Sequence, residues 1–330
     1  MHTPPMKVDA LLPLVDLAEI TAAAERIRGI ARRTPLVHGS SSPHQALLLK
    51  CENMQVAGAF KIRGAANMLA RLGPDELVRG VITYSSGNHG QALACAAGLL
   101  GAPAVVVMPT TAPAVKVSGT RGFGAEVVFA GTTSAERKSE AERLQRARGL
   151  VMVPPFDHPW IIAGQGTVGL EILEDCPDVH EVYVPVGGGG LLAGVAAAVK
   201  ALRPATRVVG VEPSGAAKMS RSLAAGAPVT LDRTASIADG LLPVRPGDLT
   251  FAHARALVDE VITVDEDGLA DAVRFLAREA KILVEPSGAA SVAAVRQRYG
   301  SLDALERPIV AVISGGNIAL DQAAEILGGR

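Results

Sequence analysis

Short runs of β-branched and other apolar residues alternate along the chain with longer stretches of helical spacing. The apolar runs occupy residues 81–84, 104–108, 126–130, 182–186, 207–211, 261–264 and 308–313. In most intervals between them, as in residues 92–100 and 269–280, the apolar positions have the spacing of an amphipathic helix. Almost continuously apolar strands separated by helices are typical of parallel sheets covered on both faces. The pattern therefore predicts an α/β protein with a mostly parallel sheet flanked by helices.

Polar signals predict both ends of the first helix. Asp16 is placed to cap its N-terminus, and Glu19 follows at the spacing of a capping box. Pro35, in the sequence RTPL at residues 33–36, is predicted to end the helix because proline cannot continue one.

Length and charge narrow the class of protein. A chain of 330 residues is long for one hydrophobic core and predicts two domains. Its net charge of −1 argues against a nucleic acid or an anionic membrane as the main partner. No apolar run approaches the roughly 18 residues of a membrane span. Asp9, Pro13 and Asp16 interrupt the apolar part of the N-terminal segment, so a signal peptide is not expected.

The cysteines and histidines are scattered. Cys51, Cys95 and Cys176 have no metal-type spacing, and the seven histidines form no cluster. A reducing, cytoplasmic location is therefore expected, and no zinc site is predicted.

Three predicted strands end in glycine-rich turns that run into helices. These turns are SSGNHG at residues 85–90, GGGG at 187–190 and SGGN at 314–317. Ligands of open parallel sheets bind at the carboxyl ends of strands, and N–H groups at a helix N-terminus attract anions. Glycines that only permit tight turns are the alternative for any single loop. Three such loops in one chain favour phosphate binding.

Lys61 stands out because the chain has only 8 lysines among its 32 basic residues. It lies in the sequence GAFKIRGAANML at residues 58–69, between Gly58 and Gly64. A solvated lysine near a helix start is one interpretation. The other is an amine that reacts with a carbonyl group, since a partly buried lysine loses its proton readily and can form a Schiff base.

Other functions were compatible with parts of this pattern. Gly188, Gly190 and Ala193 fit the dinucleotide-binding pattern G-x-G-x-x-A, and Glu212 lies 22 residues beyond Gly190, where an acid would bind a ribose. An NAD-binding Rossmann oxidoreductase would, however, leave Lys61 and the other two loops unexplained. A non-catalytic small-molecule sensor would explain the glycines but not the lysine.

Six motifs in sequence order resemble the pyridoxal-phosphate-dependent serine/threonine dehydratase and serine racemase family, which has the tryptophan-synthase-like fold. They are GAFKIRGA, SSGNHGQALA, VPVGGGGLLAGV, GVEP, ILVEPSGAA and VISGGN. The resemblance runs from residue 33 to about residue 320. It implies two domains, each with an open, mostly parallel sheet flanked by helices: a large cofactor-binding domain of residues 1–53 and 152–330, and a small substrate-loop domain of residues 54–151. It also implies a homo-oligomer, usually a dimer.

The resemblance assigns roles to individual residues. Lys61 would hold pyridoxal 5'-phosphate covalently and, once freed, would remove the substrate Cα proton. The implied cofactor-binding residues are Phe60, Lys61, Asn88, Gly187, Gly188, Gly189, Gly190, Leu191, Gly240, Glu285 and Ser314. Among them, Asn88 would bind the phenolic oxygen, and Ser314 would face the pyridine nitrogen. The implied substrate-binding residues are Ser85, Ser86, Gly87 and His89, and Ser86 is also a candidate second catalytic residue.

The implied reaction is elimination of water from L-threonine, L-serine or a similar 3-hydroxy amino acid, giving a 2-oxo acid and ammonia. A hydroxyl at Ser314 cannot keep the pyridine nitrogen protonated, and this favours elimination over transamination. Serine racemization, or another β-elimination or β-replacement, is the alternative within the fold. Ala59 and Phe123 depart from residues common in the family, whereas PPFDHP at residues 154–159 looks more like a threonine dehydratase. No feedback control through a C-terminal regulatory domain is expected.

No metal requirement is predicted. In metal-dependent relatives, a cation is held by the acid of the VEP motif, a carbonyl four residues on and a second acid two residues further. The matching positions here are Glu212, Ala216 and Lys218, so the last has the opposite charge. The Lys218 ammonium would pair with Glu212 and supply the positive charge. Alternatively, Lys218 points into solvent and leaves a weak site for a monovalent cation.

Overall fold

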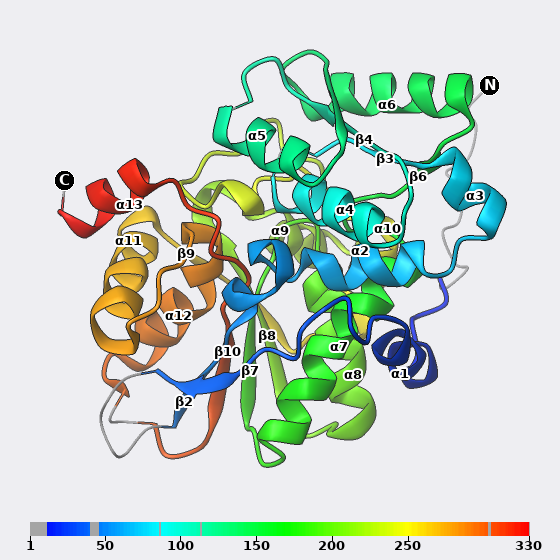
Figure 1. The fold of residues 1–330 in the computed structure, drawn as a ribbon. Helices are drawn as coiled ribbons and strands as arrows, with labels where there is room; N and C mark the ends of the chain where they lie inside the picture. Colours follow the sequence, from blue (N-terminus) through cyan, green and yellow to red (C-terminus); the bar gives the residue numbers. More distant parts are fainter. Residues whose placement is uncertain (1–11, 40–45, 86, 113, 303–304, 330) are drawn as a thin grey trace, which may run out of the picture.

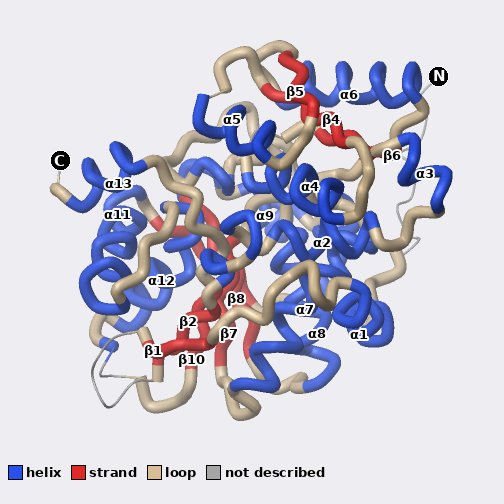
Figure 2. Tube along the Cα trace, viewed as in Figure 1, coloured by secondary structure: helices blue, strands red, loops and turns tan. Residues whose placement is uncertain are grey.

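The computed structural model describes residues 12–39, 46–85, 87–112, 114–302 and 305–329. Its strands form two separate groups (Figures 1 and 2). The larger sheet has the order β1-β2-β10-β7-β8-β9, with strands β1 (Leu36–His38), β2 (Leu47–Lys50), β7 (Glu181–Pro185), β8 (Arg207–Pro213), β9 (Glu260–Val264) and β10 (Ile309–Val312). The smaller sheet has the order β5-β4-β3-β6, with strands β3 (Val81–Thr83), β4 (Ala104–Met108), β5 (Glu126–Phe129) and β6 (Val151–Met152).

The strand pairing confirms the predicted α/β class. Every pair in the smaller sheet is parallel, and in the larger sheet only β1 and β2 pair antiparallel. All seven predicted apolar runs overlap a strand. The short strands β1, β2 and β6 were not predicted, because LVH, LLLK and VM are too brief to show a period.

The helices alternate with these strands and cover both sheets (Figure 1). They are α1 (Leu17–Arg26), α2 (Lys61–Leu69), α3 (Pro74–Arg79), α4 (Asn88–Leu99), α5 (Ala114–Gly122), α6 (Ser134–Arg148), α7 (Pro159–Asp175), α8 (Gly190–Leu202), α9 (Lys218–Ala225), α10 (Asp248–Leu257), α11 (Glu266–Phe275), α12 (Pro286–Tyr299) and α13 (Leu320–Leu327). Short helical turns are η1 (Glu52–Met54), η2 (Val56–Gly58), η3 (Ser214–Ala216), η4 (Asp239–Leu241) and the π-helical turn η5 (Leu276–Ala280). In the described part of the chain, none of the helices is long and apolar enough to cross a membrane.

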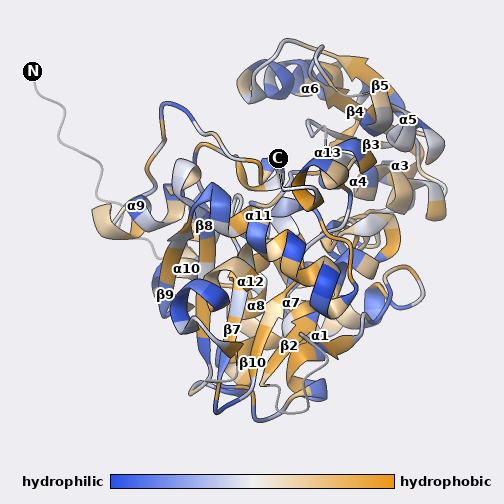
Figure 3. Cartoon of the chain, turned by 90° about the vertical axis from the view of Figure 1, so that its left-hand side faces the viewer, coloured by the Kyte–Doolittle hydropathy of each residue, from blue (hydrophilic) through white to orange (hydrophobic). Residues whose placement is uncertain are grey.

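The apolar strands of the larger sheet lie inside this helical cover, and Figure 3 shows β7 and β10 as hydrophobic strands between helices. Glycines allow the helices nearest the sheets to approach closely. A Cβ atom on Gly164 of α7 would lie 2.6 Å from the Cα atom of Gly64 in α2. Because α2 begins at Lys61, this contact holds the helix that carries Lys61 against α7.

The first helix begins as predicted but ends earlier. The Asp16 carboxylate accepts a hydrogen bond from the Glu19 backbone N–H at 2.8 Å, which is the predicted cap. The Glu19 side chain pairs with Arg71 instead of returning to the backbone. The prediction that Pro35 ends the helix was wrong. The helix ends at Arg26, and the chain then turns at Gly29, which has a φ of +80°.

Candidate active site

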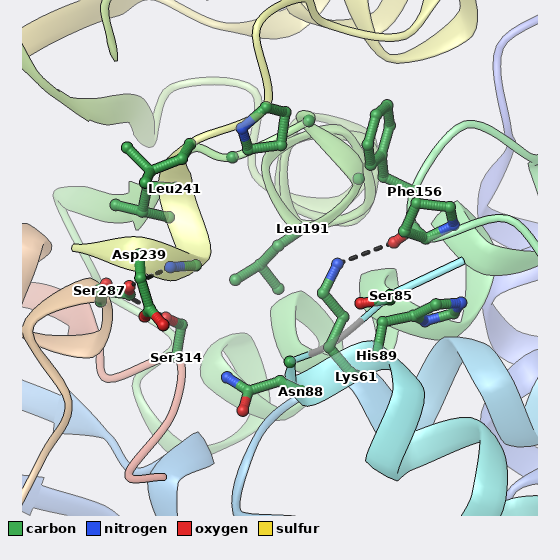
Figure 4. Close-up of a pocket in the computed structure, with 18 of the residues that line it drawn as sticks. Lys61, Ser85, Asn88, His89, Phe156, Leu191, Asp239, Leu241, Ser287 and Ser314 are labelled. Atoms are coloured by element: carbon green, nitrogen blue, oxygen red, sulfur yellow. Dashed lines mark hydrogen bonds between the residues drawn. The ribbon is translucent and has the colours of Figure 1, made fainter. Parts of the chain in front are cut away.

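The three glycine-rich turns meet at one cavity of about 470 Å³ (Figure 4). Its lining comes from the carboxyl ends of β3, β7 and β10, and it includes Ser85, Asn88, Gly188 and Ser314. Lys61 enters the same cavity from the start of α2. Strand ends from both sheets therefore converge where the glycine pattern placed a binding site.

The amine of Lys61 has few interactions that would stabilise its protonated form. Its Nζ atom donates to the Pro155 carbonyl oxygen at 2.7 Å and lies 5.0 Å from the centroid of the Phe60 ring. Of the described residues, no carboxylate forms an ion pair with it. Burial lowers the pKa of Lys61 to about 8. About a tenth of this amine is thus neutral at pH 7, and a neutral amine is both a nucleophile and a base.

The glycine loop, residues 187–191, forms a narrow cradle between β7 and α8. A Cβ atom on Gly188 would lie 2.2 Å from the Phe156 ring, and one on Gly187 would lie 2.9 Å from the Gly240 carbonyl oxygen. Gly189 has a φ of +98°, which larger residues rarely adopt. The loop leads directly into the N-terminus of α8, where backbone N–H groups and the helix dipole favour a phosphate group. Its backbone therefore suits the phosphate of pyridoxal phosphate.

Asn88 is held from two sides at the start of α4. Its Oδ1 atom accepts a hydrogen bond from Asn317 at 2.9 Å, and its Nδ2 atom donates to Glu285 at 2.8 Å. An amide nitrogen carries a second N–H that can donate to a ligand oxygen. The amide plane of Asn88 is therefore fixed before any ligand binds.

Glu285 and Ser314 also line the cavity. Burial raises the pKa of Glu285 to about 7, and Asp239 raises it further, while the hydrogen bond from Asn88 opposes the shift. Ser314 is buried, and its hydroxyl is 3.4 Å from the Ser287 carbonyl oxygen. The Ser287 hydroxyl accepts a hydrogen bond from the Gly240 N–H at 2.9 Å. One wall of the cavity is therefore formed by Gly240, Glu285, Ser287 and Ser314.

The predicted substrate loop also lines the cavity. Ser85, Gly87 and His89 are part of its wall, whereas Ser86 lies outside the described residues. His89 is buried, with Nε2 at 3.1 Å from the Val153 carbonyl oxygen. Burial lowers the pKa of His89 to about 3, and the charge of Lys61 contributes to this shift. The imidazole is therefore neutral near pH 7 and offers hydrogen bonding but no positive charge.

Sequence reasoning missed several lining residues. Phe156 supports the glycine loop, and Lys116 and Asp239 form an ion pair of 2.5 Å at the cavity. Arg137 of α6 also lines the cavity. The sequence PPFDHP gave a signal for Phe156, because this motif resembles threonine dehydratases. Nothing local marks the other three, whose positions depend on how the two sheets are arranged.

Glu212 and Lys218 lie together beneath the glycine loop, and both side chains are fully buried. Lys218 Nζ is 3.1 Å from the Glu212 carboxylate and donates to the carbonyl oxygens of Val186, Ala216 and Leu241 at 2.7, 3.1 and 3.0 Å. Lys218 therefore does not point into solvent. The Glu212 carboxylate also accepts hydrogen bonds from the backbone N–H groups of Met219 and Ser220. Together with Lys218 these groups enclose the carboxylate, so it is unavailable to bind a ribose.

An amine-bearing lysine facing a glycine phosphate cradle, between two α/β sheets, defines an enzyme that uses pyridoxal phosphate. The family described as "Pyridoxal-phosphate dependent enzyme" matches residues 27–315, and the chain belongs to this family. This family assignment argues against the alternative of an NAD-binding Rossmann oxidoreductase.

Relatives and solved structures support this assignment at high coverage. The chain is 42% identical over 317 residues to an L-threonine ammonia-lyase of Thermotoga maritima, covering 95% of this chain and 78% of the relative. It is 42% identical over 311 residues to a serine racemase of Oryza sativa subsp. indica, covering 92% and 91%. The structure of maize serine racemase matches with a TM-score of 0.89 at 40% identity, covering 94% of this chain and 96% of that one.

Proposed function

We propose that this protein is an ammonia-lyase that eliminates water from L-threonine, L-serine or a similar 3-hydroxy amino acid. The products are a 2-oxo acid and ammonia. Bound pyridoxal phosphate supplies a carbonyl group for the substrate amine and an acceptor for the electrons of the Cα–H bond. The observation that carries the proposal is the amine of Lys61, which lies in the cavity with a lowered pKa and with no counter-ion in the described part of the chain.

The chain's own residues divide the remaining work. Lys61 would take the proton from the substrate Cα atom and would then donate it to the departing hydroxyl, which leaves as water. The glycine loop binds the phosphate and fixes the cofactor's position. Asn88, held by Asn317 and Glu285, orients the cofactor through its free N–H. Ser314 offers the ring nitrogen a neutral hydroxyl, so charge is less delocalised and loss of the β-hydroxyl is favoured.

A substrate panel tests the proposal. Purified holoenzyme is incubated with L-threonine, L-serine and further 3-hydroxy amino acids, and 2-oxo acid and ammonia are measured. Equal amounts of the two products from at least one of these substrates are expected. Release of neither product from any of them, by protein that carries the cofactor, would overturn the lyase assignment.

Racemization is a second candidate, because a serine racemase is as similar to this chain as the threonine ammonia-lyase is. Ser86 is the predicted residue on the cofactor face opposite Lys61. D-serine would then form beside the oxo acid. Chiral analysis of residual L-serine during extended turnover decides, and a complete absence of D-serine would leave Ser86 with a binding role only.

Arg137 favours substrates that carry a second carboxylate. Two of its guanidinium nitrogens donate to the Thr132 carbonyl oxygen and the Ser134 hydroxyl, but its buried Nε–H has no partner among the described residues. Besides Arg137 and Lys61, the described lining has two further cationic side chains, Lys116 and Arg245, and these are paired with Asp239 and Asp248. A 3-hydroxy amino acid with a β-carboxylate would satisfy Arg137, and Arg137→Met should raise the KM for that substrate about tenfold relative to threonine.

We also propose a cytoplasmic homodimer, with residues 54–151 acting as the small domain and residues 1–53 and 152–330 as the large one. The exposed side chains of Met54 and Leu283 support a dimer contact, because the Asn53 side chain bonds the Leu283 backbone and brings these segments together. Light scattering during size-exclusion chromatography should give twice the 33.9 kDa chain mass. A monomer at micromolar concentration would contradict the dimer.

A further inference from the structure

Residues 155–157, between β6 and α7, contact both Lys61 and the glycine loop. The Pro155 carbonyl oxygen accepts the hydrogen bond from Lys61. The Phe156 ring packs directly against Gly188 of the glycine loop. Asp157 is not part of the cavity lining, so its carboxylate has a different task.

The Asp157 carboxylate binds the N-terminus of α10. It accepts hydrogen bonds from the backbone N–H groups of Asp248, Leu249 and Thr250 at 2.9, 3.0 and 3.1 Å. These groups have no partner within the helix, and the helix dipole favours a negative charge beside them. The aspartate therefore fixes the position of the first turn of α10.

The first turn of α10 also forms hydrogen bonds with the glycine loop. The Thr250 hydroxyl donates to the Gly188 carbonyl oxygen at 2.7 Å, and the Gly247 N–H donates to the same oxygen at 3.3 Å. The Gly188 carbonyl thus points toward α10. In a trans peptide the C=O and the following N–H point in opposite directions, so the N–H of Gly189 points away from α10. Gly189 lines the cavity, so its N–H would be one of the donors of the phosphate cradle.

We infer that Asp157 is a positioning residue for the phosphate cradle. It acts through α10 to fix the peptide between Gly188 and Gly189, so that the N–H group is presented to the cofactor phosphate. Because Pro155 is two residues away, the same segment also holds the amine of Lys61.

The test compares two ligands that differ only in the phosphate. Apoprotein of the full chain is titrated with pyridoxal phosphate and with pyridoxal, and binding is followed by the absorbance of the Schiff base with Lys61. In Asp157→Ala, affinity for pyridoxal phosphate should fall about tenfold while affinity for pyridoxal stays within about twofold of the wild-type value. A merely structural role would weaken both ligands equally.

Two further variants keep the inference testable. Thr250→Val has nearly the same shape but lacks the hydroxyl that bonds Gly188, so it should show the same selective loss even if Asp157→Ala does not fold. Asp265→Ala is the matched control, because Asp265 caps α11 by accepting from the Gly268 N–H at 2.8 Å, away from the cavity. Its ratio of the two affinities should equal that of the wild type. An unchanged ratio in both Asp157→Ala and Thr250→Val, or an equal loss for both ligands, would overturn the inference.

Discussion

Lys61 and Lys218 both lie near the glycine loop, but they differ in what surrounds the ammonium group. Lys61 has one carbonyl partner and no carboxylate, whereas Lys218 has the Glu212 carboxylate and three carbonyl oxygens. Burial lowers the pKa of both side chains, and Glu212 opposes that shift at Lys218. The comparison teaches that burial alone does not make a lysine reactive. Because no carboxylate among the described residues pairs with Lys61, its amine is available for chemistry, whereas the four oxygen contacts of Lys218 give that side chain a structural role.

The largest expected effect comes from removing the reactive amine. We predict that purified protein is yellow and that borohydride attaches the cofactor to Lys61. In Lys61→Ala, turnover should fall about a thousandfold or more, because both the covalent link and the base for the Cα proton are lost. The melting temperature should change little. Steady-state 2-oxo acid formation measures the loss, with Lys200→Ala as a control for a lysine outside the cavity. Near-normal turnover in Lys61→Ala would place the base elsewhere and break the comparison.

The second effect is on stability, and it concerns Lys218. Lys218→Met removes the cation but leaves the Glu212 carboxylate buried, which should lower the free energy of unfolding by about 3–5 kcal/mol. Urea unfolding of the holoenzyme measures this change. The double variant Lys218→Met/Glu212→Gln should recover part of the loss, because it leaves no unpaired buried charge. A loss below about 1 kcal/mol in Lys218→Met would mean that the ion pair contributes little to the fold.

A third prediction concerns the absence of a metal requirement. Chelator treatment of the wild-type enzyme should leave activity and melting temperature unchanged, because Lys218 supplies the positive charge beside Glu212. In Lys218→Asp, magnesium or calcium should restore stability, by about 2.7 kcal/mol when the free metal exceeds its Kd a hundredfold. Thermal unfolding with and without each ion measures the gain. Strong reactivation of chelated wild-type protein by either ion would contradict the role of Lys218.

The sequence was a good guide where a signal is local. Apolar runs located the strands, and the glycine turns located the carboxyl ends that meet at the cavity. The ion pair of Lys218 with Glu212 was predicted from the resemblance, but the rest of the environment of Lys218 could not be predicted in the same way. Its shell comes from Glu212 and from carbonyls of three separate segments, and any residue type can offer a carbonyl. Asp157 is a similar case, because its partners are backbone N–H groups on α10, about ninety residues later in the chain.

The smallest expected effect is the pH dependence of the Lys61 amine in the apoprotein. Its pKa of about 8 means that the protonated form dominates below pH 8 and the reactive neutral form above it. Between pH 7 and pH 9 the neutral fraction, and hence the rate of Schiff-base formation, should rise about tenfold and then level off. An ordinary lysine would keep gaining reactivity up to a pH of about 10.4. Pyridoxal is the better probe, because it lacks a phosphate that titrates in the same range. Borohydride trapping and peptide mapping should place the label on Lys61 and not on Lys218, whose side chain is fully buried. A midpoint near pH 10 would show that the cavity does not desolvate the amine, and the contrast between the two lysines would then rest on accessibility alone.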